Sequence, residues 1–564
     1  MMDKTPIWAW WGWEPLQFYQ TSQSAVELPP NFAEDMHAWY DLLHSEETVK
    51  AAADLGIDFA VTHFVKGFGL ANERAEMENT RMLAERCHRH GIRVCGYLQF
   101  GTLFHRQFFQ ETPEAQEWIQ VKEDGTPQWW CGNPERYLPC VNADEFFSYL
   151  KQVIRIGLTE TGLDALHFDN FYSRPCYCPR CRQAFRAETG MELPAESLLE
   201  QTDSPWTDPV LLTWIKWRCA RLAKRQRELA EYARSLKPDT LIIWNPSPIR
   251  GLLNQPALRA TDPRQLGPTT GFLWAEGGNF PGVAKDGKLV HQVNFYKTAE
   301  ALDYRVFSTV WTRDREGDGL PARAAAIELY LAEAMVFHGC LGTNWLLRPG
   351  RLQEFLNCGW NNPMISAFAR YVAFFRKHED IYAQSQPANP IAVQLDYDEC
   401  IADYQNRYGR FLLLQQILLQ NHLPFDLSFT PDQHHSLVLN TATALPETWN
   451  AREFITGDYR SASSLPSGHE ELARQWTASA QDSLPCQVLQ AKNTTVAELR
   501  RLEDGRHALH LLNYQATDEP AVVTFRSSPS TVHLLTPENE ATLSPASNGL
   551  LTLPPFRTLA TLIW

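Results

Sequence analysis

Short apolar runs alternate with helical stretches through roughly residues 1–385, and this alternation constrains the fold more than any other feature of the sequence. The segments between the runs have helical patterns, as in Ser45–Asp54, Glu73–His90 and Ala322–His338, and Gly56 and Gly91 are placed to stop two of these helices. Eight runs read as buried strands: Ile7–Trp11, Phe59–Phe64, Val94–Phe100, Ala165–Phe168, Leu241–Asn245, Gly271–Ala275, Val306–Trp311 and Gly339–Leu346. Eight strands separated by helices predict a (β/α)8 barrel of the α/β class.

The pattern changes after Pro387. Ile391–Leu395 and Ser436–Asn440 read as strands, and Arg407–Asn421 reads as an amphipathic helix between them, which favours a small α/β domain. From about Gln487 short strands and turns follow, which indicates a terminal β-sandwich: His507–Tyr514, Ala521–Phe525, Thr531–Leu535 and Leu559–Trp564. We therefore predict three domains, at 1–385, 386–482 and 483–564.

Charge and composition exclude several classes of partner. A net charge of -15 without any block of Lys or Arg argues against nucleic acid, which is bound through clustered positive charge. The sequence starts without an apolar signal region and contains no stretch that could span a bilayer, so we expect no membrane partner and a cytoplasmic location. Twelve cysteines spread over 564 residues are not a disulfide scaffold, and a reducing compartment favours metal ligation or free thiols.

Two of the predicted strands end in carboxylates. Asp169 follows the fourth strand and Glu276 the sixth, at the edge of a barrel where catalytic residues gather. Glycosidic bond cleavage usually needs two carboxyl groups, so this pair is the economical candidate, although either could instead cap a helix or hold an arginine. Other acids are weaker candidates: Glu14 follows the first strand, and the loop after the seventh contains Asp314, Glu316 and Asp318 among mixed charges and glycines.

Aromatic and polar residues at the strand ends are candidates for binding a sugar. The chain has 19 tryptophans, many at predicted strand ends, where flat rings can stack on sugars or fill the barrel mouth. His167 should share a side of its strand with Asp169, where it could bond a sugar hydroxyl or only fill a barrel layer. Arg348 would suit a carboxylate or sulfate on the sugar. The predicted substrate-binding set is His63, His167, Asn170, Tyr172, Trp244, Asn245, Trp274, Trp311, Asn344, Arg348, Trp11 and Trp13.

A cysteine cluster follows the fourth strand closely. The spacing of Cys176, Cys178 and Cys181 lets three thiolates converge on one ion, and Cys131 or Cys140 could supply a fourth. Such an all-thiolate site has no open position for water, so we expect one structural zinc ion per chain, fixing loops, and no catalytic cofactor. The alternative is a group of reduced thiols without metal.

At these residues the chain resembles the family 42 glycoside hydrolases, which are β-galactosidases. They have a similar cysteine run followed by Phe-Arg, here Phe185-Arg186, and their upstream zinc cysteine implies Cys140 as the fourth ligand. They also append a flavodoxin-like trimerisation domain and a small β-sandwich, which implies a homo-oligomer, a dimer or trimer. The catalytic residues differ, because this chain has Asp169-Asn170 where that family has Asn-Glu, and no Glu ends its seventh strand.

An acid on the fourth strand paired with one on the sixth is instead similar to the retaining α-glycosidases of families 27, 31 and 36. An uncharacterised group of proteins related to glycoside hydrolases shares the Phe-Asp-Asn and cysteine features. The resemblance to families 27, 31 and 36 implies Asp169 as nucleophile and Glu276 as acid/base of a glycoside hydrolase that removes a terminal sugar. The alternatives are a β-galactosidase-like enzyme with other acids, a non-catalytic carbohydrate-binding barrel, and a zinc hydrolase, which a cysteine-only cluster disfavours.

Overall fold

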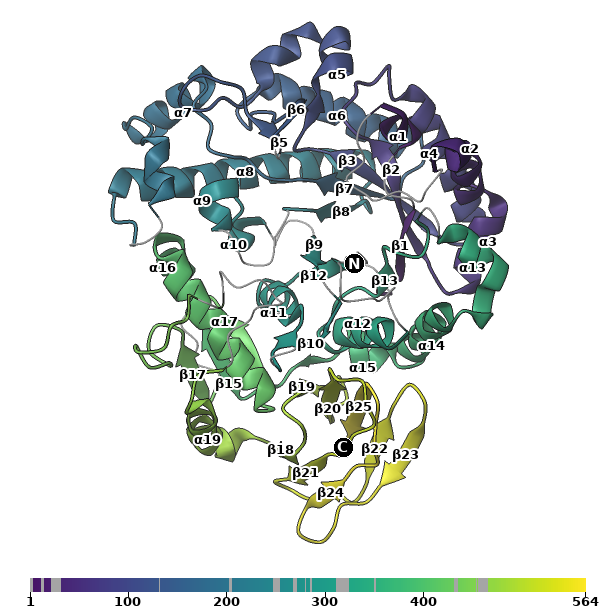
Figure 1. Ribbon diagram of the computed structural model, residues 1–564, viewed down its shortest axis with the longest axis vertical. Helices are drawn as coiled ribbons and strands as arrows, with labels where there is room; N and C mark the ends of the chain where they lie inside the picture. Colours follow the sequence, from purple (N-terminus) through teal and green to yellow (C-terminus); the bar gives the residue numbers. More distant parts are fainter. Residues whose placement is uncertain are drawn as a thin grey trace. The chain divides into compact units, whose positions relative to one another are not determined.

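The structure is a computed structural model, and it falls into two compact units, which we describe separately (Figure 1). Unit 1 comprises residues 1–277, 302–309 and 342–359, and unit 2 comprises 278–301, 310–341 and 360–564. The described residues are 4–11, 15–21, 32–130, 132–201, 205–246, 254–266, 271–278, 280–284, 287–310, 324–348, 351–430, 435–452, 454 and 465–564.

Unit 1 is built on an eight-stranded sheet whose strands follow the order of a (β/α)8 barrel. Chain-order neighbours pair from β1 to β12, and β13 pairs back onto β1, with every described register parallel. The strands are β1 (Trp8–Trp11), β2 (Phe59–Val65), β3 (Arg93–Gln99), β7 (Ala165–Asp169), β8 (Leu241–Trp244), β9 (Phe272–Gly278), β12 (Arg305–Val310) and β13 (Gly342–Thr343). The predicted barrel is confirmed.

The strand predictions hold closely, and the largest difference is at the eighth. There the strand is only Gly342–Thr343. The Trp8 indole packs against Gly342 so closely that a Cβ at that position would lie 2.3 Å from a ring atom. The predicted seventh strand ends at Val310, and Trp311 lies outside the described residues. The glycine stops are also confirmed, since Gly56 and Gly91 have φ of 85° and 72° and directly precede β2 and β3.

Helices of unit 1 lie between consecutive strands from β1 to β9. Ser45 caps α3 by accepting a bond from the Thr48 amide, as its place in the sequence predicts. The helices are α1 (Leu16–Thr21), α2 (Phe32–Leu43), α3 (Glu46–Asp54), α4 (Arg74–Arg89), α5 (His105–Glu111), α6 (Asp144–Thr159), α7 (Pro179–Thr189), α8 (Pro209–Leu236), α9 (Gln255–Arg259), α10 (Pro263–Leu266) and α13 (Leu352–Cys358), with 3-10 turns η1 (Pro113–Trp118) and η2 (Glu196–Glu200). A small antiparallel sheet after β3 contains β4 (Leu103–Phe104), β5 (Trp129–Trp130) and β6 (Asn133–Tyr137).

Aromatic side chains fill the barrel. The Trp274 ring packs against Trp8, Trp10 and His167 with centroids 4.9, 5.0 and 4.6 Å away. Because alternate residues of a strand face the same side, Asp169 shares the inward side of β7 with His167, whereas Phe168 stacks on Trp244 at 4.4 Å. The interior is therefore closed beneath the residues that end the strands.

Unit 2 contains a three-stranded parallel sheet in the order β16-β15-β17, which agrees with the predicted α/β segment. The helix predicted there is present as α17, but the prediction that it is amphipathic is wrong, because every residue from Leu413 to Gln420 is buried. The elements are β15 (Ile391–Gln394), α16 (Tyr397–Ala402), α17 (Tyr404–Gln420), β16 (Phe425–Ser428), β17 (Leu437–Asn440) and α19 (His469–Ala480), preceded by β10 (Gly282–Val283), β11 (Leu289–Val290), α11 (Val293–Ala301), α12 (Ala324–Val336), η4 (Gly359–Asn361), α14 (Pro363–Lys377) and α15 (Glu379–Ala383).

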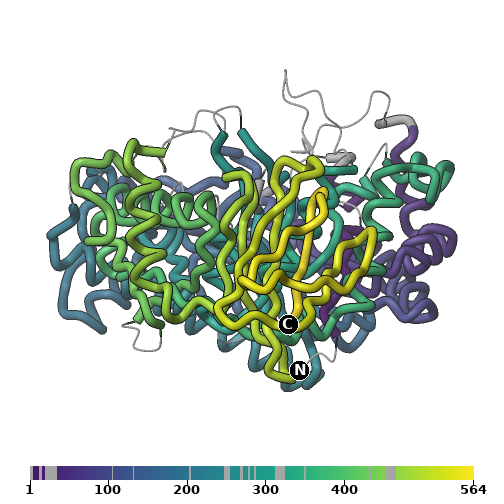
Figure 2. Tube along the Cα trace, turned by 90° about the horizontal axis from the view of Figure 1, so that it is seen from below, coloured from purple at the N-terminus to yellow at the C-terminus, as the bar shows by residue number. Residues whose placement is uncertain are grey.

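The C-terminal strands form two antiparallel sheets that share one apolar core, in agreement with the predicted β-sandwich (Figure 2, yellow). One sheet contains β14 (Gln386–Pro387), which precedes β15 in the chain, followed in sheet order by β19 (Thr495–Arg501), β20 (His507–Asn513), β25 (Leu559–Ile563), β22 (Val532–Leu535) and β23 (Glu540–Leu543). The other sheet contains β18 (Cys486–Gln490), which follows η5 (Gln481–Ser483), with β21 (Val522–Phe525) and β24 (Leu550–Thr552). The boundaries of the three domains stay a prediction. None of the described helices is both long and apolar enough to cross a membrane.

Candidate active site

Asp169 ends β7 and is held by three neutral donors. The Tyr97 hydroxyl donates to Oδ2 at 2.6 Å, Asn245 Nδ2 donates to Oδ1 at 2.7 Å, and the neighbouring Asn170 amide also donates to Oδ2. The carboxylate is buried, and among the described residues no lysine or arginine forms a salt bridge with it. Neutral donors fix the orientation of the group and leave its negative charge uncompensated by an ion pair.

Asn245 brings the two predicted catalytic acids together. Its Nδ2 also donates to Glu276 Oε1 at 3.3 Å, in addition to the 2.7 Å bond to Asp169. The two bonded carboxylate oxygens therefore lie at most about 6 Å apart, which is the sum of those two distances. Retaining glycosidases separate their carboxyl groups by about 5–5.5 Å, and inverting enzymes by about 6.5–9.5 Å.

The surroundings of Glu276 favour its protonated form. Burial, followed by the nearby Asp169 charge, raises the pKa of the Glu276 carboxyl to about 7, although the Asn245 bond and the charges of Arg259 and Lys66 oppose the shift. A carboxyl with this pKa can exist as the acid or the carboxylate near neutral pH. This is the property that a group alternating between general acid and general base requires.

The backbone of Asn170 adopts the left-handed conformation. Its φ is 51°, and its Cβ approaches Gly101 so closely that a Cβ on Gly101 would lie 2.5 Å away. The amides of Phe100 and Gly101 both donate to the Asp169 carbonyl, at 3.1 and 3.3 Å, which joins β3 to the turn after β7. The Asn170 side chain accepts a bond from Trp130 Nε1 at 3.3 Å, and this leaves its amide nitrogen for Asp169.

Tyr97 and Lys66 belong to the site although the sequence analysis missed both. Lys66 Nζ donates to the Tyr97 hydroxyl at 3.0 Å, and Tyr97 in turn donates to Asp169. The buried Glu73 carboxylate accepts from the amides of Gly67 and Phe68 at 3.0 and 2.9 Å, which fixes the loop that contains Lys66. Tyr97 lies two residues before the end of β3, so strand alternation was the signal that could have identified it.

The two predicted histidines lie one layer below the acids. His167 is fully buried, stacks on Trp274, and has its pKa lowered to about 4 by burial. His63 lies 3.9 Å from Glu73, and burial keeps its pKa well below the usual value. Among the described residues neither imidazole has a hydrogen-bond partner. Both rings are therefore neutral parts of the barrel interior.

Several predicted sugar-binding residues are buried in the structure. The Trp11 indole donates to the Leu43 carbonyl at 2.8 Å, and Trp244 packs on Phe168 and Phe171, so both belong to the core, as Trp274 does. Tyr172 is buried with the Arg259 guanidinium 4.8 Å from its ring centre, Asn344 is buried after β13, and Arg348 is half-buried. Outside the described residues are Trp13, Trp311, Glu14, Cys131, Asp314, Glu316 and Asp318.

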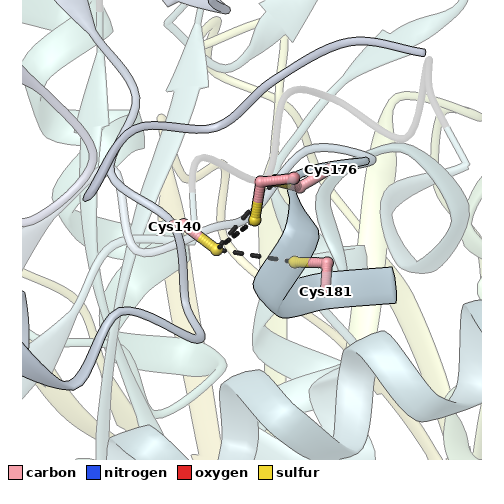
Figure 3. A group of neighbouring side chains, drawn as sticks. Cys140, Cys176 and Cys181 are labelled. Atoms are coloured by element: carbon pink, nitrogen blue, oxygen red, sulfur yellow. Dashed lines mark hydrogen bonds between the residues drawn. The ribbon is translucent and has the colours of Figure 1, made fainter. Parts of the chain in front are cut away.

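The four predicted cysteines gather in one buried cluster. Figure 3 shows three of them, Cys140, Cys176 and Cys181. Cys140 Sγ lies 3.5, 3.7 and 3.9 Å from the sulfurs of Cys181, Cys178 and Cys176. Tetrahedral zinc with bonds of about 2.3 Å sets its sulfurs about 3.8 Å apart, so the donor atoms and their spacing fit that ion. The cluster could hold a metal ion, and it would join the segment before α6 to the loop that follows Asp169.

Neighbouring groups favour a thiolate at one position of this cluster, Cys178. The Asn142 side-chain amide donates to Cys181 Sγ at 3.2 Å, and Arg221 holds that amide through its carbonyl at 3.0 Å. Cys178 is the N-cap residue of α7, and hydrogen bonds from the other thiols lower its pKa, whereas the pKa values of Cys140 and Cys181 lie well above their usual value. A donor such as the Asn142 amide and the N-terminus of a helix both stabilise negative charge on a neighbouring sulfur.

We found no protein-family model and no curated protein that matches the sequence. Solved structures of similar fold do exist. The α-L-fucosidase isoenzyme 2 from Paenibacillus thiaminolyticus is 12% identical with a TM-score of 0.61 over 99% of each chain. A β-galactosidase from Bacillus circulans sp. alkalophilus is 12% identical with a TM-score of 0.66 over 99% of each chain. A β-galactosidase from Rahnella sp. R3 is 11% identical, with a TM-score of 0.65 over 100% of this chain and 98% of that chain.

At these identities the likeness shows the fold. This chain shares the barrel and the β-rich C-terminal region with glycoside hydrolases over nearly the full length of both chains, which confirms at the level of fold the resemblance inferred from the cysteine motif.

Proposed function

We propose that the protein is a retaining glycoside hydrolase with Asp169 as nucleophile and Glu276 as acid/base. One observation supports this most strongly: Asn245 bonds to both carboxylates at the C-terminal edge of the barrel, and the acid on the sixth strand has a pKa of about 7. The similar structures, which include an α-L-fucosidase and β-galactosidases, support carbohydrate as the substrate.

The reaction has two steps. In the first, a carboxylate oxygen of Asp169 bonds to the anomeric carbon while the glycosidic bond breaks, and the leaving oxygen takes the proton of Glu276. In the second, the Glu276 carboxylate takes a proton from water, whose oxygen bonds to the anomeric carbon as the bond to Asp169 breaks. Asn245 holds the two carboxyl groups in fixed positions relative to each other. Tyr97 and Asn170 orient the nucleophile in both steps.

Zinc held by Cys140, Cys176, Cys178 and Cys181 belongs to this proposal as a structural ion. Four thiolates complete its coordination and leave no position for substrate or water, so its role is to fix the loop between Asp169 and α7.

Removal of a terminal sugar, a homo-oligomeric state and a cytoplasmic location stay predictions, and light scattering at micromolar concentration tests the oligomer.

A panel of 4-nitrophenyl glycosides tests the function. The purified protein should release 4-nitrophenol from at least one member, and Asp169→Asn should abolish this activity. Asp262→Asn is a matched control, because Asp262 is also buried in unit 1 but is paired with Arg264 at 2.8 Å. If a sugar binds and the wild-type protein cleaves no glycoside, the barrel is a carbohydrate-binding module instead.

A further inference from the structure

Gln99 lies beside the proposed nucleophile without a role assigned so far. It ends β3, is buried, and stands directly opposite Asp169 in the parallel register of β3 and β7. Adjacent strands are about 4.8 Å apart, and residues opposite each other face the same side of the sheet. The Gln99 amide therefore projects into the barrel next to the Asp169 carboxylate.

Arg136 fixes the orientation of this amide, because the single proton of the neighbouring Tyr97 hydroxyl is donated to Asp169. The Gln99 Oε1 atom is 2.7 Å from the Tyr97 hydroxyl and 3.4 Å from Arg136 Nη2. A guanidinium only donates hydrogen bonds, so the oxygen of the amide must face Arg136, and the nitrogen must face away from it. Arg136 is itself fixed, because it donates to Thr102 Oγ1 at 3.0 Å and lies 4.0 Å from the Trp130 ring centre.

The other end of the amide is a buried donor that needs an acceptor. Among the residues that the structure describes, none accepts a hydrogen bond from Gln99 Nε2, although the atom is shielded from solvent. Buried amide nitrogens are nearly always hydrogen-bonded, and an exception beside a reactive carboxylate points to a ligand that supplies the acceptor.

We propose that Gln99 Nε2 donates to the 2-hydroxyl of the sugar whose anomeric carbon Asp169 attacks. This inference rests on the proposed glycosidase function. A group one strand spacing from the nucleophile reaches substituents next to the anomeric carbon, which are the ring oxygen and the 2-hydroxyl. The ring oxygen gains positive charge in the transition state and is a poor acceptor, whereas hydrogen bonds to the 2-hydroxyl strengthen there. The site is thus specific for sugars with an unmodified 2-hydroxyl.

A double-mutant cycle between enzyme and substrate tests this contact. Gln99→Met and the wild-type protein are compared on an aryl glycoside cleaved by the enzyme and on its 2-deoxy counterpart. We expect Gln99→Met to lower kcat/KM about 100-fold on the first substrate and less than about threefold on the second, since the 2-deoxy sugar has no acceptor to lose.

A second variant and a control separate recognition from support. Gln99→Glu keeps an oxygen for Arg136 but removes the donor, so it should show the same substrate dependence, and thermal melts would verify that each variant is folded. Gln226→Met removes a buried amide in α8 and should affect both substrates equally. Equal losses on both substrates in the Gln99 variants would overturn the contact while leaving the glycosidase intact. A wild-type protein inactive on every glycoside would overturn both proposals.

Discussion

Two groups of neighbouring carboxylates among the described residues differ in their partners, one in unit 1 and one in unit 2. In unit 1, Asp169 and Glu276 bond to amides and a hydroxyl, and among the described residues neither has a salt bridge. In unit 2, Glu498 contacts Lys297 Nζ at 2.6 Å, and Glu300 contacts Arg500 at 2.7 Å.

The carboxylates of the cluster in unit 2 have a structural role, because a buried lysine pairs with them. Carboxylate oxygens of Glu300, Asp426 and Glu498 lie within 4.8 Å of one another, a spacing that could hold a metal ion. The Lys297 ammonium lies 2.6, 3.4 and 3.9 Å from Glu498, Asp426 and Glu300, and therefore already supplies the positive charge. Hydrogen-bonded ion pairs of this kind stabilise one conformation of the residues around them.

The comparison shows that a raised pKa alone does not identify a catalytic acid. Burial raises the pKa of both Glu276 and Glu498 to about 7. Only Glu276 lies next to a second acid at the barrel edge, with neutral partners that permit it to exchange a proton. The predictions below test this difference by changing one cluster at a time.

The largest effect should follow from Asp169→Asn. We expect kcat to fall about 10⁴-fold or more, because no carboxylate remains to attack the anomeric carbon. Sugar binding measured by calorimetry and the thermal midpoint should stay close to those of the wild-type protein. Retained turnover would show that the two clusters do not differ in the way described.

Glu276→Ala should reduce turnover by about 10²- to 10⁴-fold on substrates with poor leaving groups. Aryl glycosides with good leaving groups should be affected less, and azide should restore turnover by attacking the glycosyl-enzyme. Since the acid must be protonated, wild-type kcat/KM should fall as pH rises through about 7, and this decline should vanish in the variant. A decline that persists in Glu276→Ala would assign it to another group.

Glu498→Gln should lower the stability of the protein and leave kcat unchanged, the reverse of what we expect for Asp169→Asn. It leaves Lys297 buried without its nearest carboxylate, so unfolding of unit 2 in urea should require about 3 kcal/mol less free energy. The kcat of the folded variant should match that of the wild-type protein. A large loss of kcat without loss of stability would transfer the catalytic assignment to this cluster.

The last and smallest expected effect comes from the cysteine cluster, and it concerns metal content and stability. Elemental analysis of protein purified without added metal should find one zinc ion per chain, and Cys178→Ser should lower both that content and the thermal midpoint. Cys219→Ser is the matched control, because Cys219 is also a buried cysteine of unit 1 but lies outside the cluster. Metal-free protein of full stability would contradict the structural zinc.

The fold was largely predictable because each barrel strand is a contiguous apolar run, and the order of such runs leaves few topologies. The catalytic pair was predictable as a hypothesis for the same reason, since Asp169 is the last residue of β7, Glu276 lies near the end of β9, and the ends of the two strands meet at one edge. The spacing of the cysteines likewise anticipated a cluster that the structure brings together.

Roles that depend on which way a strand faces were not predictable from position alone. Trp11 and Trp244 are near strand ends, yet both pack away from the barrel interior. Tyr97 and Gln99 matter because their register places them opposite His167 and Asp169, and parallel register is not encoded in either segment by itself. Lys66 reaches Tyr97 only because Glu73 fixes its loop.

The central claim is that Asp169 acts as a nucleophile with Glu276 close enough for retention. Proton NMR of the first-formed product anomer, recorded with a glycoside that the enzyme cleaves, tests this most directly. We predict that the product has the anomeric configuration of the substrate, as two carboxylate oxygens at most about 6 Å apart imply. An inverted product would contradict the account, because Asp169 would then be a general base that activates water.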